Sequence, residues 1–227
     1  MRIGTWNCQT GLAPNWEHVQ ALDSDVLTVQ ECGPETKEFV ESHSGWTCEW
    51  QAGRYREGVA VLAREPFRIA STELSEPCVL SVVIGSPASG QFRFVGFWAM
   101  TPVNEADGYP QQATRLIKWL PQDDLPTMVA GDFNASSRNP THLSNVAALL
   151  ERGIVSAYHS FHGLEHTDQW DDATSYHQWS EAKPFHMDYI FLPSRWEVEG
   201  VEVGTYEEYP AKRLSDHVPI VVSVSLG

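Results

Sequence analysis

The sequence predicts an α/β protein in which two packed mixed sheets are flanked by helices. Short runs rich in Val, Ile and aromatic residues alternate with stretches of helical periodicity along the chain, which indicates βα units. Other neighbouring runs are separated only by tight turns, which indicates hairpins. The 227 residues suffice for one large core and contain no linker or repeat, so a single domain over residues 1–227 is expected.

The N-terminal half supplies most of the expected strands. Buried-type apolar runs predict them at residues 2–8, 24–32, 58–64, 78–85 and 92–100. The turn sequence SPASGQ joins the last two. Short helices are expected at residues 15–22, with Asn15 as N-cap, and at residues 33–43. Residues 47–55 predict an irregular strand followed by a loop.

The C-terminal half continues the alternation of helices and strands. The expected order is helix 109–120, strand 127–133, helix 140–153, strand 185–193 and strand 217–226. Gly153 is typical of the residue that follows a helix. Residues 156–183 are polar and aromatic and are expected to form a loop, and residues 196–206 connect the last two strands.

The net charge of -15 is unusual, whereas 42% hydrophobic and 20% charged residues are ordinary for a globular protein. Binding of a long polyanion relies on Lys and Arg that displace counterions. A chain this acidic is therefore not expected to bind long nucleic acid through its overall field. Local binding of a phosphate, directly or through a divalent cation, stays open.

The cysteines and the apolar runs bear on the cellular compartment. Cys8, Cys32, Cys48 and Cys78 form no CxxC pair and no zinc spacing, so we interpret them as reduced thiols. No apolar run approaches the roughly 20 residues that a bilayer requires. The chain begins with a strand-like sequence and not with a signal peptide, so a cytoplasmic location without membrane contact is expected.

Polar side chains recur where the expected strands end or begin. They are Asn7, Glu31, Asp132, Asn134, Asp188, Asp216 and His217. Ligands of sheet proteins gather at strand ends, where the backbone holds side chains rigidly. GDFN by itself is equally typical of an Asx turn. Six separate segments with such residues are harder to explain as turns, and Asp188 inside a buried strand requires a partner.

These segments also resemble a known family. WN, QE, GDFN, DYIF and SDH, in this order from Asn7 to His217, resemble the endonuclease/exonuclease/phosphatase superfamily, which has the DNase I-like fold. The resemblance implies a four-layer α/β/β/α sandwich with the active site at one edge of the two sheets. It also implies an enzyme that hydrolyses phosphate esters with Mg²⁺ or Mn²⁺ as cofactor.

The resemblance implies a role for each residue. Glu31 would be the principal metal ligand, with Asn7 and Asp216 close to the ion, and hard oxygen ligands suit Mg²⁺.

The other four residues would carry the chemistry. Asp132 would orient or deprotonate the attacking water, and Asn134 would hold that water or a phosphate oxygen. His217 would bind the phosphate, and Asp188 would fix the tautomer of His217 and favour its cationic form.

The chain departs from the family pattern at one position. Relatives carry a His or Tyr after the strand at residues 92–100, where this chain has Met100, which cannot donate a strong hydrogen bond. Glu57 resembles the carboxylate that supports the missing His, and a surface salt bridge explains it equally well. His186 precedes Asp188 by two residues, so strand geometry predicts a common face and contact with phosphate, with simple packing as the alternative.

Aromatic and basic residues are candidates for substrate contacts. Trp98 is expected in the core or stacked on a base, and Trp170, Tyr176 and Trp179 could also stack. Arg54 and Arg56 are candidate phosphate contacts. His159, His162 and His166 have metal-like spacing, but Gly163 interrupts any helix there, so either a zinc site or solvated histidines is expected.

The combined prediction is a monomeric, divalent-metal-dependent phosphoesterase that hydrolyses a phosphodiester by in-line attack of water. The resemblance ranks nucleic acid first among substrates, and the acidic charge favours a short or single-stranded nucleic acid or a nucleotide. The alternatives are a phosphatase or diesterase acting on a nucleotide, sugar phosphate or lipid headgroup, and a catalytically silent binding module. Loops between the motifs determine specificity in such a fold, so the sequence leaves the substrate open.

Overall fold

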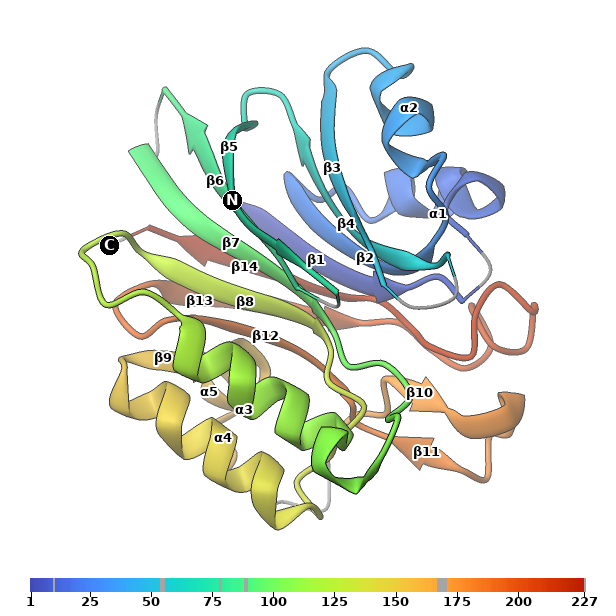
Figure 1. Ribbon diagram of the computed structural model, residues 1–227. Helices are drawn as coiled ribbons and strands as arrows, with labels where there is room; N and C mark the ends of the chain where they lie inside the picture. The colour runs from blue at the N-terminus through green and yellow to red at the C-terminus, as the bar shows by residue number, and fades with distance from the viewer. Residues whose placement is uncertain (10, 54–55, 78, 88–89, 167–170, 227) are drawn as a thin grey trace.

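Two six-stranded sheets pack face to face in the computed structural model, which describes every residue except 10, 54–55, 78, 88–89, 167–170 and 227 (Figure 1). The first sheet has the order β13 (Glu197–Val203), β14 (Ile220–Ser225), β1 (Arg2–Asn7), β2 (Val26–Cys32), β4 (Gly58–Arg64) and β3 (Trp46–Ala52). The second has the order β5 (Arg68–Glu76), β6 (Val79–Ser86), β7 (Gly90–Trp98), β8 (Thr127–Asp132), β12 (Asp188–Pro193) and β9 (Ile154–Ser156). Each sheet is mixed, because β1 and β2 are parallel, as are β7 and β8, among antiparallel neighbours.

Helices cover the outer face of each sheet (Figure 1). The first sheet is covered by α1 (Trp16–Ala21) and α2 (Thr36–Glu41), and the second by α3 (Tyr109–Trp119), α4 (Pro140–Glu151) and α5 (Ala157–His162). A two-stranded hairpin of β10 (Ser175–Tyr176) and β11 (Pro184–Phe185) extends from one end, and η1 (Ala13–Asn15), η2 (Glu105–Asp107) and η3 (His177–Trp179) are short 3-10 turns. The predicted sandwich of two mixed sheets flanked by helices is confirmed.

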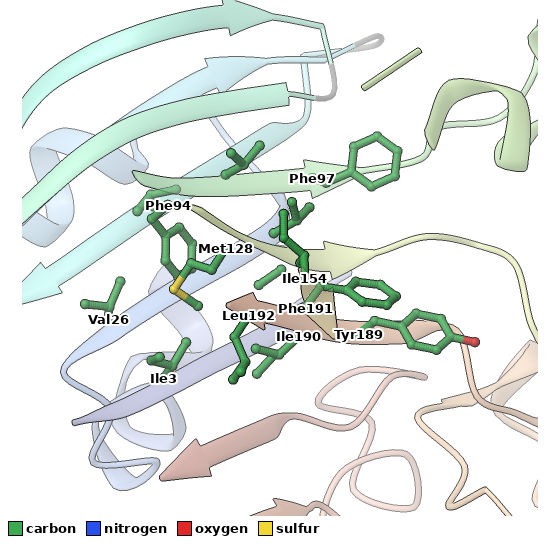
Figure 2. Close-up of a cluster of buried hydrophobic side chains, with 14 of the residues drawn as sticks. Ile3, Val26, Phe94, Phe97, Met128, Ile154, Tyr189, Ile190, Phe191 and Leu192 are labelled. Carbon is green, nitrogen blue, oxygen red and sulfur yellow. The ribbon is translucent and has the colours of Figure 1, made fainter. Parts of the chain in front are cut away.

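Strand alternation divides the buried side chains into layers. Ile3 and Val26 of the first sheet and Phe94 and Met128 of the second belong to one buried cluster and are drawn close together in Figure 2. Phe97, Tyr189 and Phe191 stand at the other parity of their strands, and each of their rings contacts the Phe133 ring. Alternate residues of a strand point to opposite faces, so the even-numbered positions of β8 and β12 point between the sheets.

The structure corrects several element predictions. Residues 157–162 form α5, where we expected a loop, because Ser156 accepts a hydrogen bond from the His159 backbone as N-cap and Gly163 ends the helix at φ 65°. β5 and β13 were not predicted. β13 is an edge strand in which glutamates interrupt the apolar residues, so the sequence contains no apolar run that would indicate a strand. Asn15 precedes α1 but caps nothing, because its amide donates to the carbonyls of Cys8, Gly11 and Leu214.

The structure describes three of the four cysteines. Cys8, Cys32 and Cys48 are free and buried, and Cys78 lies outside the described residues. Burial raises the pKa of the Cys32 thiol to about 12, so it is protonated at neutral pH. Among the described residues, no helix has the length and apolar character to cross a bilayer.

Candidate active site

Two buried carboxylates from neighbouring strands lie opposite each other at one end of the second sheet. Asp132 ends β8 and Asp188 begins β12, and the antiparallel register pairs them directly. Both are completely buried and point between the sheets. Like charges in direct opposition are destabilising unless a positive group separates them.

His217 supplies that positive group. Its Nδ1 donates to Asp188 Oδ2 at 2.8 Å, and its Nε2 lies 3.3 Å from Ser175 Oγ and 4.0 Å from Asp132 Oδ2. The backbone holds the ring in place, because the Trp6 indole donates to the His217 carbonyl and the His217 amide donates to Ser215 Oγ. The predicted Asp188–His217 pair is thus a buried hydrogen bond with its ring directed at Asp132.

The pKa values of this cluster are strongly perturbed. Burial opposes the charge of His217, but Asp188, Asp132 and Asp216 outweigh it and raise its pKa to about 10. The ring is therefore an imidazolium with a donor on each nitrogen. Burial raises the pKa of the Asp132 carboxyl to about 7, although His217 acts in the opposite direction. A carboxylate with a pKa near neutrality is suited to accept a proton.

Glu31 reaches the site through an irregularity of β2. Regular alternation from Val26 and Thr28, which face the second sheet, would direct Glu31 toward the helices. Instead Glu31 has a left-handed backbone (φ 56°), and the pairing with β4 shifts register between Gln30 and Cys32. A bulge of this kind turns a side chain to the other face. The Glu31 carboxylate consequently accepts a hydrogen bond of 2.9 Å from Asn7 Nδ2.

Asn7 connects the two halves of the site. It is completely buried at the end of β1, and its Nδ2 also donates to Asp132 Oδ2 at 3.1 Å. Its Oδ1 accepts the backbone N–H of Gln9 at 3.0 Å. The amide therefore orients the carboxylates of Glu31 and Asp132, and only the second lone pair of Oδ1 is left for a cation.

Asn134 lies beside Asp132 in the tight turn that the sequence GDFN indicated. Its backbone N–H donates to Asp132 Oδ1 at 2.8 Å, and its Nδ2 donates to Asp132 Oδ2 at 2.9 Å and to the Ala99 carbonyl at 2.8 Å. The Asx turn is confirmed, and the role of Asn134 at the water or a phosphate oxygen stays a prediction. Gly131 permits this end of β8, because a Cβ at its φ of 147° would lie 1.8 Å from the Phe97 carbonyl oxygen.

Asp216 completes the group from the segment before β14. Its carboxylate is half-buried, and burial raises its pKa, while His217, among others, acts in the opposite direction. Burial raises the pKa of the Glu31 carboxyl, and the charges of Glu57 and Asp216 add to that effect. The two carboxylates therefore lie in the same part of the site.

The donor set fits a hard divalent cation. Glu31, Asp132, Asp188 and Asp216 surround one imidazolium, and burial raises the pKa of three of them. So many carboxylates in one buried region are costly unless a cation compensates them. Among the described residues, Asp132, Asp188 and His217 also bring ligand atoms within 4.8 Å of one another. A protonated His217 cannot ligate, however, whereas the carboxylates of Glu31 and Asp216 and the Oδ1 atom of Asn7 are oxygen donors that could hold such a cation.

The remaining candidates lie around this centre. Trp98 is buried in the core cluster and pairs in register with Asp132, which places it on the inner face at the rim. Met100 is buried beside Gly53 and the Trp98 ring, and its thioether cannot supply the strong hydrogen bond of the missing His or Tyr. Arg56 is exposed with φ 71°, whereas Arg54, like Trp170, lies outside the described residues.

His186 does not share the face of Asp188, so that prediction is wrong. Its ring packs on Tyr158 and Tyr189 at 4.8 Å each, on the helix side of the sheet, and its Nδ1 donates to the Asp172 carbonyl at 2.6 Å. Residues 186–187 lie between β11 and β12, outside either strand, and strand alternation therefore does not apply to them. The structure removes His186 from the set around His217.

The three histidines with metal-like spacing do not converge on one point. His159 is buried, bonds Ser156 Oγ and Asp171 Oδ2, and stacks on His166 with ring centroids 3.6 Å apart. His162 is exposed on α5. Stacked imidazoles direct their lone pairs along parallel planes and not at a shared ion. His159 and His166 instead belong to a layer of stacked aromatic rings, which is neither a zinc site nor a set of solvated histidines.

Two neighbours of the candidate site were missed by sequence reasoning. Ser175 contacts His217 Nε2, and Thr174 Oγ1 accepts the backbone N–H groups of Met187 and Asp188. Both lie in the stretch that we expected to be a loop. The dipeptide TS carries no distinctive signal, since Ser and Thr are common in any polar segment.

The buried His142 predicts a measurable pH effect on stability. Both of its ring nitrogens lack hydrogen-bond partners, and burial lowers its pKa to about 4. The unfolded chain takes up this proton near pH 6.5, so stability is lost as pH falls between about 6.5 and 4, by at most about 1.4 kcal/mol per pH unit. We expect His142→Phe, which preserves the stacking on Tyr189, to gain stability relative to wild type as pH falls through this window. Melting temperatures at pH 7.5 to 4.5 measure it, with the exposed His162→Gln as control; parallel curves for His142→Phe and wild type would contradict it.

Comparisons with known proteins identify the fold and the family. No curated protein matches the sequence significantly. Among solved structures, the catalytic domain of human nocturnin with bound sulfate is 18% identical, with a TM-score of 0.76 over 100% of this chain and 94% of that one. The 3′ phosphatase NExo from Neisseria bound to a product DNA hairpin is 15% identical, with a TM-score of 0.69 over 99% of each chain. A mannosyl-6-phosphatase from Bacteroides thetaiotaomicron is 15% identical, with a TM-score of 0.68 over 99% of each chain.

These structures share the fold, and their substrates differ widely. The family itself is identified by sequence. Residues 4–217, which include every site residue from Asn7 to His217, match the Endonuclease/Exonuclease/phosphatase family. The chain therefore belongs to this family of hydrolases acting on phosphate ester bonds.

Proposed function

We propose that this protein is a divalent-metal-dependent phosphodiesterase in which water attacks the phosphorus in line with the leaving oxygen. The observation that carries the proposal is the arrangement of His217 between two buried carboxylates. Asp188 lies 2.8 Å from one ring nitrogen, and Asp132 lies 4.0 Å from the other. The gap on the Asp132 side is wide enough for a phosphate oxygen or a water molecule to interact with both groups.

Asp132 is the proposed general base. Its pKa of about 7 allows it to accept a proton from the attacking water at neutral pH. Asn7 and Asn134 donate hydrogen bonds to its carboxylate and fix its orientation. As the oxygen of the water bonds to phosphorus, its proton passes to Asp132, and the bond to the leaving oxygen breaks with its electron pair.

His217 is the proposed stabiliser of the transition state. As an imidazolium it can donate a hydrogen bond from Nε2 to a phosphate oxygen, whose negative charge grows as the reaction proceeds. Asp188 keeps the Nδ1 proton in place and maintains the positive charge. Ser175 Oγ holds the Nε2 proton until substrate arrives.

The metal role falls to Glu31 and Asp216, with Asn7 orienting Glu31. Mg²⁺ or Mn²⁺ held there would neutralise charge on a phosphate oxygen. The family membership, the excess of carboxylates and the partly open positions of Glu31 and Asp216 support this role.

A small or single-stranded substrate is favoured over duplex DNA, because of the formal charge of -15. The same observation favours the second candidate, a phosphatase or diesterase that acts on a small phosphorylated molecule. Hydrolysis of plasmid DNA, oligonucleotides and bis-nitrophenyl phosphate, each with Mg²⁺, Mn²⁺ or EDTA, separates the candidates. Activity that persists in EDTA, or its absence with all three substrates, would contradict the first proposal. A cytoplasmic location and a monomeric state stay predictions from the sequence.

The salt dependence of activity tests the substrate class. Each duplex phosphate neutralised by a Lys or Arg adds about one unit to the slope of log affinity against log salt. The cations available near the site, such as Arg56, Lys183, Lys212 and Arg213, are few in a chain with 15 basic and 30 acidic residues. We expect kcat/KM for a dinucleotide to change little between low and physiological salt and to exceed that for plasmid. A steep decrease of kcat/KM with salt, with plasmid as the preferred substrate, would instead favour a nuclease that acts on duplex DNA.

A further inference from the structure

The β10–β11 hairpin is fastened directly to the catalytic segment before β14. The Tyr176 N–H donates to the Asp216 carbonyl at 2.7 Å, and the Val218 N–H donates to the Thr174 carbonyl at 2.8 Å. Ser175 forms an isolated bridge with His217. Figure 1 shows the hairpin at the same end of the sandwich as the segment that precedes β14. These bonds therefore hold the hairpin at a constant position relative to Asp216 and His217.

The tip of this hairpin begins next to the Asp216 backbone, which accepts the Tyr176 N–H. Ser175 points at His217, and His177 follows Tyr176 as the first residue of η3. Consistently, His177 is among the groups that act on the Asp216 carboxyl, whose pKa burial raises. The tip, residues 177–180, thus begins one residue beyond the hydrogen bond that ties Tyr176 to Asp216.

An arginine–tryptophan pair lies where this tip meets the segment before Asp216. The guanidinium of Arg213, three residues before Asp216, lies over the Trp179 ring, 5.0 Å from its centroid. The Tyr206 hydroxyl donates to the Trp179 carbonyl at 3.0 Å, and Lys183 Nζ donates to Gln178 Oε1 at 2.9 Å. These bonds connect the tip to the loop after β13 and to the other side of the hairpin.

The backbone on both sides of the pair is held in an unfavourable conformation. Gln178, Trp179 and Arg213 have φ values of 57°, 61° and 60°, a left-handed region that L-residues with large side chains rarely adopt. Such strain concentrates at functional positions, where the surrounding structure maintains it. Here two separate loops adopt it at the point where their side chains meet.

Arg213 differs in its charge partners from five other arginines of the chain. Arg2, Arg64, Arg68, Arg93 and Arg115 each contact a carboxylate. No carboxylate among the residues that the structure describes lies within 4.0 Å of the exposed Arg213 guanidinium. In a protein of charge -15, an uncompensated guanidinium stacked on an indole next to Asp216 is suited to a planar ring that is attached to a phosphate.

We propose that Trp179 and Arg213 form the binding site for a nucleobase adjacent to the scissile phosphate, so that the substrate is a nucleotide or short oligonucleotide. This inference rests on the proposed phosphodiesterase activity and assigns its substrate class. The base stacks on the pair, and the Arg213 charge favours the phosphate that carries this base. The pair determines specificity and takes no part in bond breaking.

The test compares a dinucleotide with an analogue in which the sugars and the phosphodiester are retained and both bases are absent. We expect Trp179→Ala and Arg213→Ala each to lower kcat/KM for the dinucleotide about tenfold or more, mainly through KM. The effect on the base-free analogue should be less than twofold. Trp179→Phe keeps a stacking ring and should retain most of the activity. Melting temperatures of all variants show whether a loss of activity comes from a folding defect.

The chain offers a matched control in a second cation–π pair. Arg64 lies 5.9 Å from the Trp46 ring centroid, beside the opposite end of β2 from Glu31, and Trp46→Phe should leave both substrates unaffected. Equal losses on both substrates, no loss on either, or wild-type preference for the base-free analogue would overturn the inference. If wild type hydrolyses neither substrate, the proposed activity fails. Calorimetric binding of the dinucleotide to wild type and Trp179→Ala, which needs no turnover, then still decides the inference: unchanged affinity overturns it.

Discussion

Replacement of Glu31 by Gln should reduce kcat by at least about 10³-fold, because it removes the carboxylate that holds the divalent cation and several kcal/mol of transition-state stabilisation with it. The fold should survive, since Gln can still accept the hydrogen bond from Asn7 Nδ2 and the bulge already exists at this position. The same variant should lose the rise in melting temperature that millimolar Mg²⁺ gives the wild-type protein. Steady-state kinetics and thermal unfolding with and without Mg²⁺ measure both effects.

A matched control for this variant is Glu38→Ala, which removes an exposed carboxylate on α2. It should change neither the activity nor the response to Mg²⁺. Wild-type turnover by Glu31→Gln in Mg²⁺ would remove Glu31 from the metal site. A normal Mg²⁺-induced shift in melting temperature with lost activity would instead assign the cation to other carboxylates, such as the Asp132 and Asp188 group.

His217 and Asp188 should behave as one unit. We expect His217→Ala and Asp188→Asn each to lower kcat by about 10² or more, equivalent to about 2.7 kcal/mol, because each removes the cationic donor or the group that maintains its charge. The double variant should be little slower than the slower single variant. The kinetic double-mutant cycle measures this coupling directly, and losses that multiply would show that the two residues act separately.

A second buried His–Asp pair provides the control for this cycle. His159 Nε2 lies 3.3 Å from Asp171 Oδ2 on the helix side of the second sheet. Asp171→Asn should reduce stability and leave kcat unchanged. His217→Ala leaves the Asp188 carboxylate buried without its partner, which costs stability, so His217→Gln, which can still donate to Asp188, should accompany it. A folded His217→Gln protein with wild-type kcat would exclude the imidazolium from the reaction.

Most of the candidate site follows from where polar residues stand in the sequence. Asn7, Asp132, Asp188 and His217 each adjoin a run of apolar residues, and strand ends of packed sheets meet at one edge. Their mutual contacts of 2.8 to 4.0 Å agree with that expectation. The resemblance to the family added their roles, which stay predictions until the variants are measured.

Other features depended on long-range contacts that no local pattern encodes. The bulge at Glu31 arises because β2 must pair with β4 while its carboxylate meets Asn7. His186 turns away from Asp188 because the chain leaves β11 before it enters β12. The helix α5 was missed because its histidines and aromatic residues have weak intrinsic helix preference, and packing on β12 and β9 decides their conformation.

The sequence by itself determined the layered architecture, the positions of the strand-end carboxylates and the acidic charge, because these depend on apolar periodicity and composition along the chain. Only the tertiary structure decided which side chains meet: that His217 lies between Asp188 and Asp132, that Ser175 contacts the same ring, and that Arg213 lies over Trp179 beside Asp216. The physical reason is that side-chain direction depends on strand register, bulges and left-handed turns. Pairing between distant segments determines the register, the bulges and the turns, because the local conformational preference of a single residue is too small to determine them.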